Sequence, residues 1–406
     1  MIDLVKNYAI TTRRIKKSVI RELLKLTNKP GVISFAGGLP DPDAFPVEWI
    51  EEVTMKVIKE NSKSSLQYGP TDGMPELKRE IVKHSKKLGE NIRDENVLVT
   101  TASQQGLELL GKVFIDPSDP VIVELPSYIG GLQVFGAYSA KMHGVPMDDN
   151  GIRTDLLEEL IIKLKKDEER YKFLYLVPDF QNPSGVTLSQ ERRKKVLELS
   201  YKYDFLVVED SPYKDVRFEG TPPATLQSMD GLKSVITLRT FSKIFVPGIR
   251  VGWVVANEDI ISKMALAKQA MDLCTSSLCQ LIAAKFCELG YLDKQIAFVS
   301  KRYKEKRDLM MSALEKYMPK VEGLRWTRPD GGLFLWLELP KNLSADELFP
   351  KAIEEKVAYV IGSAFHCDGS GANTMRLNFS FPTHEQIDEG IKRLGNLVKK
   401  QLVNQK

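Results

Sequence analysis

Six short apolar runs, separated by longer amphipathic stretches, dominate the chain between residues 96 and 256. They are rich in Val, Ile and Leu with little polar alternation, and they cover residues 96–100, 121–124, 172–179, 205–210, 235–240 and 251–256. This composition is typical of strands that are buried on both faces. Helical patterns lie between several of them, as in Ser103–Val113 and Ser189–Tyr203. The alternation predicts an α/β domain over residues 45–290, with helices covering a mostly parallel sheet.

The pattern changes after residue 290. We expect a long charged helix from about Asp293 to Tyr317, strands within 331–340 and 375–380, and a terminal helix over 383–401. Strands and helices grouped in this way predict a smaller α+β domain over residues 291–406. Residues 1–44 are expected to form an N-terminal arm that contributes to the small domain and to the substrate site.

The charge of the chain excludes some classes of partner. The 406 residues include 58 Lys+Arg and 54 Asp+Glu, so the net charge is 58 − 54 = +4. So weak a balance predicts no nucleic-acid partner and no attraction to an anionic membrane. No window approaches the ~18 apolar residues of a membrane span. The first residues are basic but no apolar run follows them, so we expect no secretory signal.

Metal and disulfide chemistry are also unexpected. The four Cys and four His form neither a CxxC pair nor an HExxH motif, so no Cys/His metal site is predicted. Reduced thiols indicate a cytoplasmic protein. His143 and His366 are general-base candidates, but we expect them to be structural.

The segment TFSKIFVPGIR (240–250) follows one predicted strand and groups two hydroxyls, an amine and a guanidinium. Thr240, Ser242 and Arg250 are suited to hold a phosphate dianion through charge-assisted hydrogen bonds. Lys243 has apolar neighbours, so its amine is expected to be partly desolvated and available for imine formation. A phosphate site beside such a lysine is what pyridoxal 5′-phosphate requires. A surface Ser-Lys turn is the alternative interpretation.

Other polar residues follow predicted strands, where ligands bind in parallel sheets. Asp210, after the run FLVVE, would pair with a protonated pyridine nitrogen, and Tyr213 and Asn182 would reach the cofactor's phenolic oxygen. Taken separately, each of these residues is expected to be structural, as a helix cap or a turn former.

A series of motifs resembles the fold-type I, class I/II aminotransferases, and within them the group of 2-aminoadipate and kynurenine aminotransferases. The matching strings run in the family's order: SFAGGLPDP (34–42), LQYGPTDG (66–73), TTASQQGLELLGKVF (100–114), PSY (126–128), FQNPSG (180–185), VVEDSPY (207–213), TFSKIFVPGIRVG (240–252), GGLFLWLELP (331–340) and MRLNFS (375–380). The resemblance implies a large domain with a sheet of the seven-stranded type, a small domain, and pyridoxal 5′-phosphate as the cofactor.

The resemblance also implies a role for individual residues. Lys243 resembles the catalytic lysine that binds the cofactor covalently, Asp210 the partner of its ring nitrogen, and Tyr128 the aromatic residue that stacks on the ring. The remaining positions would bind the phenolic oxygen (Asn182, Tyr213), the phosphate (Ser103, Gln104, Thr240, Ser242, Arg250, and Tyr68 from the other subunit of a homodimer with shared sites) and the substrate carboxylate (Arg376, with Gly38 and Asn182 close to it).

Three positions differ from the usual family pattern. Ala102 stands where glycine is common, Thr240 replaces a frequent serine, and Ser211 follows Asp210 where an acid or small residue is frequent. All three changes are expected to be tolerated, because the roles use backbone groups or a hydroxyl that remains.

The implied activity is transfer of an amino group from an L-amino acid to a 2-oxo acid such as 2-oxoglutarate, by a ping-pong mechanism. Arg21 matches an arginine that can meet a distal substrate carboxylate in the 2-aminoadipate members; a solvated helix charge is the alternative interpretation. The same arm in relatives accepts aromatic or long aliphatic side chains, so acidic, aromatic and long aliphatic donors all remain open. One alternative is another pyridoxal-phosphate reaction, such as a carbon–sulfur β-lyase. A more remote alternative is a non-enzymatic regulator with this domain, although the pattern starts near Ser18 and leaves no room for a ~60-residue winged helix.

Overall fold

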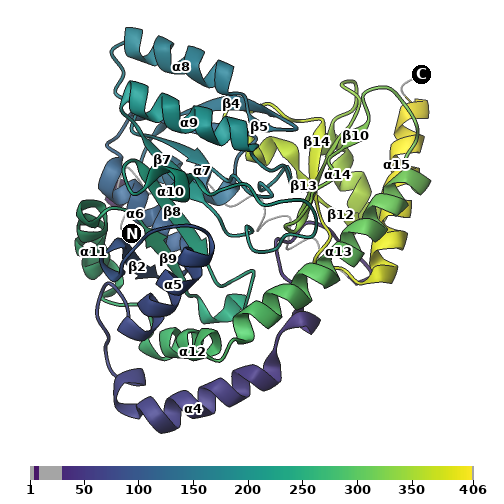
Figure 1. The fold of residues 1–406 in the computed structure, drawn as a ribbon. Helices are drawn as coiled ribbons and strands as arrows, with labels where there is room; N and C mark the ends of the chain where they lie inside the picture. Colours follow the sequence, from purple (N-terminus) through teal and green to yellow (C-terminus); the bar gives the residue numbers. More distant parts are fainter. Residues whose placement is uncertain (1–3, 9–29, 405–406) are drawn as a thin grey trace.

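The computed structural model describes residues 4–8 and 30–404 (Figure 1). The α-helices of this part of the chain are α1 (Leu4–Asn7), α4 (Val47–Ser65), α5 (Pro75–Lys87), α6 (Ala102–Phe114), α7 (Ile129–Ala137), α8 (Thr154–Lys166), α9 (Gln190–Tyr203), α10 (Leu226–Asp230), α11 (Glu258–Asp272), α12 (Ser277–Glu288), α13 (Tyr291–Tyr317), α14 (Ala345–Glu354) and α15 (His384–Asn404). Short 3₁₀-helices lie at η1 (Pro42–Ala44), η2 (Asp94–Asn96), η3 (Pro247–Ile249) and η4 (Gly362–Phe365). Among the described residues, no helix has the length and apolar character that a membrane span requires.

The largest sheet within residues 30–404 has eight strands, in the order β2-β9-β8-β7-β6-β3-β4-β5. These are β2 (Val97–Thr100), β3 (Pro120–Leu125), β4 (Lys141–Asp148), β5 (Gly151–Ile152), β6 (Phe173–Leu176), β7 (Leu206–Asp210), β8 (Val235–Thr240) and β9 (Gly252–Val255). All six apolar runs predicted as strands lie in it, which confirms the α/β prediction. The pairings from β8 to β4 are parallel, whereas β9 runs antiparallel to β2 and β8. No α-helix crosses over between β8 and β9 in this described segment, so β9 returns beside β8 in the opposite direction.

Both faces of this sheet are buried, and for that reason its strands lack polar alternation. Successive side chains of a strand point to opposite faces. On β6, Phe173 and Tyr175 join the apolar cluster beneath α6, α7 and α11, whereas Leu174 and Leu176 join the cluster beneath α8, α9 and α10. Figure 1 shows α8 and α9 together on one side of the sheet.

A second, antiparallel sheet has the strand order β10-β11-β14-β13. It consists of β10 (Arg325–Trp326), β11 (Phe334–Glu338), β13 (Val360–Ile361) and β14 (Thr374–Asn378). The predicted helices of this region are present as α13 and α15, which pack against each other (Figure 1). The short strand β1 (Ile33–Ser34) pairs in parallel with β12 (Val357–Ala358), so the segment after residue 30 lies against the C-terminal part of the chain. The domain boundaries at residues 44 and 290 stay a prediction.

Candidate active site

A cavity of about 330 Å³ opens where the parallel strands of the large sheet end and β14 of the second sheet comes close. Its lining includes every predicted site residue except Tyr68 and Arg21: Gly38, Ser103, Gln104, Tyr128, Asn182, Asp210, Tyr213, Thr240, Ser242, Lys243, Arg250 and Arg376. The remaining lining residues are Leu39, Pro40, Ala102, Val177, Pro212, Pro247 and Phe334. Residues that lie far apart in the sequence therefore share one small volume.

One wall of the cavity is suited to an anion. The Thr240 and Ser242 hydroxyls lie 2.8 Å apart, and Arg250 Nη1 donates to Ser242 Oγ at 3.4 Å. The N-terminus of α6 faces the same cavity through Ser103 and Gln104, and the side chain of its N-cap residue Thr101 makes no capping hydrogen bond. Free N–H groups and the helix dipole at such an end favour a negative charge.

The start of α6 is held in a tight backbone arrangement. Ala102 has φ of +59°, in the left-handed region that glycine prefers. Strand β9 passes directly beneath it, since a Cβ on Gly252 would lie 2.8 Å from the backbone nitrogen of Ser103 and 2.6 Å from the carbonyl oxygen of Arg239. Only glycine at position 252 lets the start of α6 and the end of β8 approach β9 so closely.

Asp210 ends β7 with a carboxylate that is only partly satisfied. Its Oδ2 accepts a hydrogen bond from the Tyr175 hydroxyl at 2.7 Å, while the buried Oδ1 has no partner among the described residues. Burial raises the pKa of Asp210 to about 7, against which the Tyr175 hydrogen bond acts only partly. A cationic group beside Oδ1 would stabilise the charged carboxylate, so the site is suited to a protonated ring nitrogen.

Lys243 lines the cavity, and its amine donates to the Gly38 carbonyl oxygen at 2.9 Å. Burial, followed by the positive charges of Arg376 and Arg250, lowers the pKa of Lys243 to about 8. A larger fraction of this amine is therefore neutral at physiological pH than in an exposed lysine, and a neutral amine is the nucleophilic form.

Asn182 connects two other site residues. Its Nδ2 donates to the Tyr213 hydroxyl at 3.3 Å, and its Oδ1 accepts from Arg376 Nη1 at 2.9 Å. Arg376 Nη2 donates to the Ala36 carbonyl oxygen at 2.7 Å, and the guanidinium lies 4.2 Å from the centre of the Phe334 ring. Arg376 is 2% exposed, and its Nε has no partner among the described residues. These contacts fix the Arg376 guanidinium and leave further N–H groups free, as the binding of a planar carboxylate requires.

The remaining candidates lie elsewhere. Tyr68 is 79% exposed and does not line the cavity, and Arg21 is outside the described residues. His143 approaches Glu169, and His366 Nδ1 lies 2.9 Å from the Gly362 carbonyl oxygen; neither histidine lines the cavity. Within residues 4–8 and 30–404, no group of three His, Cys, Asp or Glu side chains is placed to hold a metal ion.

Sequence reasoning missed two residues that shape the site. Tyr175 lies inside the apolar run of β6 and reaches Asp210 only because β6 and β7 are neighbours. Phe334 supports Arg376 from the adjacent strand β11, and Tyr213 packs edge-on against the same ring with centroids 5.7 Å apart. Their only signal in the sequence is an aromatic residue within a buried strand, which core packing explains equally well.

Known proteins are similar to this chain over almost its whole length. The chain is 43% identical over 402 residues to the aromatic-amino-acid aminotransferase 1 of Thermococcus litoralis, covering 99% of this chain and 96% of that protein. The crystal structure of Pyrococcus horikoshii kynurenine aminotransferase, in complex with PMP, KYN as substrate and KYA as product, matches with a TM-score of 0.95 and 42% identity over 98% of each chain. LysN, an α-aminoadipate aminotransferase from Thermus thermophilus complexed with N-(5′-phosphopyridoxyl)-L-leucine, matches with a TM-score of 0.91 and 38% identity, over 99% of this chain and 100% of that one.

A family model points to the same group as these relatives. The model described as "Aminotransferase class I and II" matches residues 32–394, a span that contains every cavity-lining residue. The fold is α/β, and Lys243, Asp210 and the N-terminus of α6 line one cavity. From the family match and these relatives, the chain belongs to the class I and II aminotransferases.

Proposed function

We propose that this protein transfers the amino group of an L-amino acid to a 2-oxo acid, with pyridoxal 5′-phosphate bound in the cavity described above. The observation that carries the proposal is that Lys243, the unpaired Oδ1 of Asp210 and the anion-binding wall line the same cavity. These three groups match the aldehyde, the ring nitrogen and the phosphate of that cofactor. The solved structures of two relatives, which contain PMP and N-(5′-phosphopyridoxyl)-L-leucine respectively, support this choice of cofactor.

The residues present fit the cofactor. Ser103 and Gln104 at the start of α6, with Thr240, Ser242 and Arg250, would hold the phosphate (all in the cavity lining). Asp210 would pair with the ring nitrogen, Asn182 and Tyr213 would bind the phenolic oxygen, and Tyr128 would stack on the ring. When bound, the cofactor supplies an electron sink for the charge that develops at the substrate α-carbon.

The chain's own residues would then bind the substrate and move its proton. Arg376 would bind the α-carboxylate through the N–H groups that Asn182 and Ala36 leave free, and this contact would orient the α-hydrogen. Lys243 Nζ would accept the proton from the α-carbon and return it on the cofactor side. A positioned base of this kind contributes about 10²–10⁴-fold to the rate.

We further propose that aromatic and long aliphatic donors fit the described lining, and that acidic donors depend on Arg21. Leu39, Pro40, Val177 and Phe334 supply an apolar surface. Besides Lys243, Arg250 and Arg376, the described residues add no cation to the lining that could meet a distal carboxylate.

Turnover of five donors with 2-oxoglutarate tests this function: 2-aminoadipate, glutamate, kynurenine, phenylalanine and leucine. We expect ping-pong kinetics with the accepted donors. In an Arg21→Ala variant, kcat/KM should fall for 2-aminoadipate and glutamate and stay unchanged for phenylalanine and leucine. Absence of turnover with all five donors would contradict the proposed aminotransferase function. Equal decreases in kcat/KM for acidic and apolar donors in the Arg21→Ala variant would contradict the proposed role of Arg21.

The lowered pKa of Lys243 predicts how the cofactor-free protein captures pyridoxal phosphate. Only the neutral amine attacks, so the rate of covalent attachment should rise about tenfold per pH unit below pH 8 and level off above about 8. Stopped-flow absorbance between pH 6 and 10 measures this profile. An ordinary lysine would instead show a rate that keeps rising to about pH 10, and that result would contradict a desolvated amine.

We also propose a homodimer in which Tyr68 of each subunit reaches the phosphate in the other. The exposure of Tyr68, and of Leu66 nearby at 70%, supports a surface that a second subunit covers. Sedimentation equilibrium should give twice the chain mass of 45.8 kDa. The cytoplasmic location stays a prediction from the composition.

A further inference from the structure

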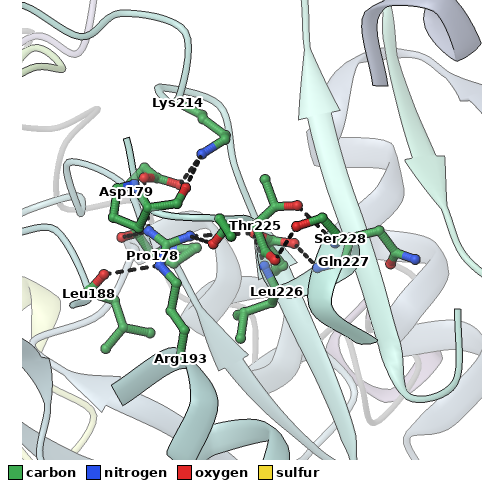
Figure 2. Close-up of polar contacts among 12 residues, drawn as sticks. Pro178, Asp179, Leu188, Arg193, Lys214, Thr225, Leu226, Gln227 and Ser228 are labelled. Carbon is green, nitrogen blue, oxygen red and sulfur yellow. Dashed lines mark hydrogen bonds and ion pairs between the residues drawn. The ribbon is translucent and has the colours of Figure 1, made fainter. Parts of the chain in front are cut away.

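A buried ion pair lies behind the cavity wall, between Asp179 and Arg193 of α9 (Figure 2). Both side chains are 0% exposed, and neither lines the cavity. In Figure 2, Arg193 extends from its helix toward Asp179, and Lys214 approaches the carboxylate from the other side. Charged groups as deeply buried as these are retained only where they are paired and hydrogen-bonded.

Arg193 closes the base of the loop that carries Asn182. Its Nε donates to the Leu188 carbonyl oxygen and its Nη2 to the Pro178 carbonyl oxygen, both at 3.0 Å. Pro178 and Leu188 stand at the two ends of this loop, which we call the 178–188 loop, and their backbones also bond to each other. A planar guanidinium is suited to this task, because its donors point in several fixed directions at once.

Asp179 connects the same loop to the segment that carries Tyr213. Its Oδ1 accepts from Arg193 at 2.9 Å, its Oδ2 lies 3.7 Å from Lys214 Nζ, and Arg217 Nη2 lies 3.7 Å from Oδ1. Lys214 directly follows Tyr213 in the sequence. Burial acts to raise the pKa of Asp179, but Arg193, Lys214 and Arg217 outweigh it and hold that pKa below its usual range.

The two connected segments meet again inside the cavity, where Asn182 bonds to Tyr213. We infer that Asp179 and Arg193 are positioning residues, which hold Asn182 and Tyr213 at the distance from which both bind the cofactor's phenolic oxygen. The inference rests on the proposed function for the identity of that oxygen. The placement of the 178–188 loop itself can be measured without any cofactor.

Arg193→Lys tests the inference. Arg193 donates to the carbonyl oxygens of Pro178, Leu188 and Ala224 and to the Asp179 carboxylate, and a lysine keeps the charge but cannot reach all four groups together. Arg192→Lys is a matched control: Arg192 precedes Arg193 on α9, and its side chain bonds to Asp148 and to the Gly151 and Ile152 carbonyl oxygens rather than to residues 178–188. In the cofactor-free protein, hydrogen exchange of residues 178–188 should accelerate at least tenfold in Arg193→Lys and stay unchanged in Arg192→Lys.

With pyridoxal phosphate bound, the pH midpoint of the cofactor's absorbance change should rise by about one unit in Arg193→Lys, because weaker donors stabilise the charged phenolic oxygen less. Unchanged exchange and an unchanged midpoint in a folded Arg193→Lys protein would overturn the inference. If that variant fails to fold, Lys214→Met decides the question: a raised midpoint supports the inference, and an unchanged midpoint overturns it. If the wild type bound no pyridoxal phosphate, the proposed function would fail, and exchange alone would decide the positioning role.

Discussion

Replacing Lys243 by alanine is expected to abolish nearly all transamination and to remove the absorbance of covalently bound pyridoxal phosphate. The side chain provides the only amine in the cavity lining of the described residues, and its depressed pKa leaves much of it neutral near pH 8. Loss of a positioned base alone predicts a decrease in kcat of at least about 10²–10⁴-fold. Steady-state kinetics and absorbance spectra of the purified variant measure both effects.

Lys263→Ala is a suitable control for this experiment. Lys263 lies on the exposed side of α11, away from the cavity, so its loss should change neither spectrum nor rate. A Lys243→Ala protein with full activity would refute the proposed role. Partial recovery of turnover by added small amines would support it, because such amines can occupy the vacated space and accept the proton.

The Arg376→Lys substitution is expected to raise the Michaelis constants for both the amino acid and the 2-oxo acid. Lysine keeps the positive charge but loses the planar fork, two of whose N–H groups bond to Asn182 and Ala36 while others remain for a carboxylate. Disrupting a buried charge pair of this kind costs roughly 2–5 kcal/mol, so kcat/KM should fall about 30-fold or more. Initial-rate kinetics with both substrates varied independently test this expectation.

Arg325→Lys serves as the matched control for Arg376→Lys. Arg325 lies in the same small sheet and pairs with Glu338, but its side chain is 71% exposed and does not line the cavity. Because exposed pairs contribute little, this variant should behave as the wild type does. Unchanged Michaelis constants in Arg376→Lys would show that another group binds the substrate carboxylate.

Much of the site was predictable because its residues follow recognisable strands. Thr240, Ser242 and Lys243 lie at or directly after the end of β8, and Asp210 ends β7, so the rule that ligands bind at the carboxyl ends of parallel strands located them. The strands themselves were visible because both faces of the sheet are covered and the runs are continuously apolar. The antiparallel course of β9 was not visible, since an apolar run does not indicate direction.

Residues that act through a neighbour were not predictable in the same way. In the sequence, Tyr175 has the pattern of a core aromatic residue, and only the pairing of β6 with β7 brings its hydroxyl to Asp210. In the sequence, Arg193 is one of many charged residues of a predicted helix, and only the tertiary fold buries it against Asp179. A motif states which groups are present, but hydrogen bonds between distant segments depend on the packing of whole elements.

The sequence by itself determined the α/β class, the family and the set of reactive groups, because these depend on local periodicity and on the order of short motifs. Only the tertiary structure decided which groups are satisfied and which are left free. Among the described residues, Asp210 Oδ1 and Arg376 Nε lack hydrogen-bond partners. The pKa of Lys243 is lowered because burial removes water from its amine and because Arg376 and Arg250 lie nearby. Desolvation is a property of the packed molecule, so the sequence indicated it only for Lys243, through the apolar neighbours of that residue, and not for Asp210 or Arg376.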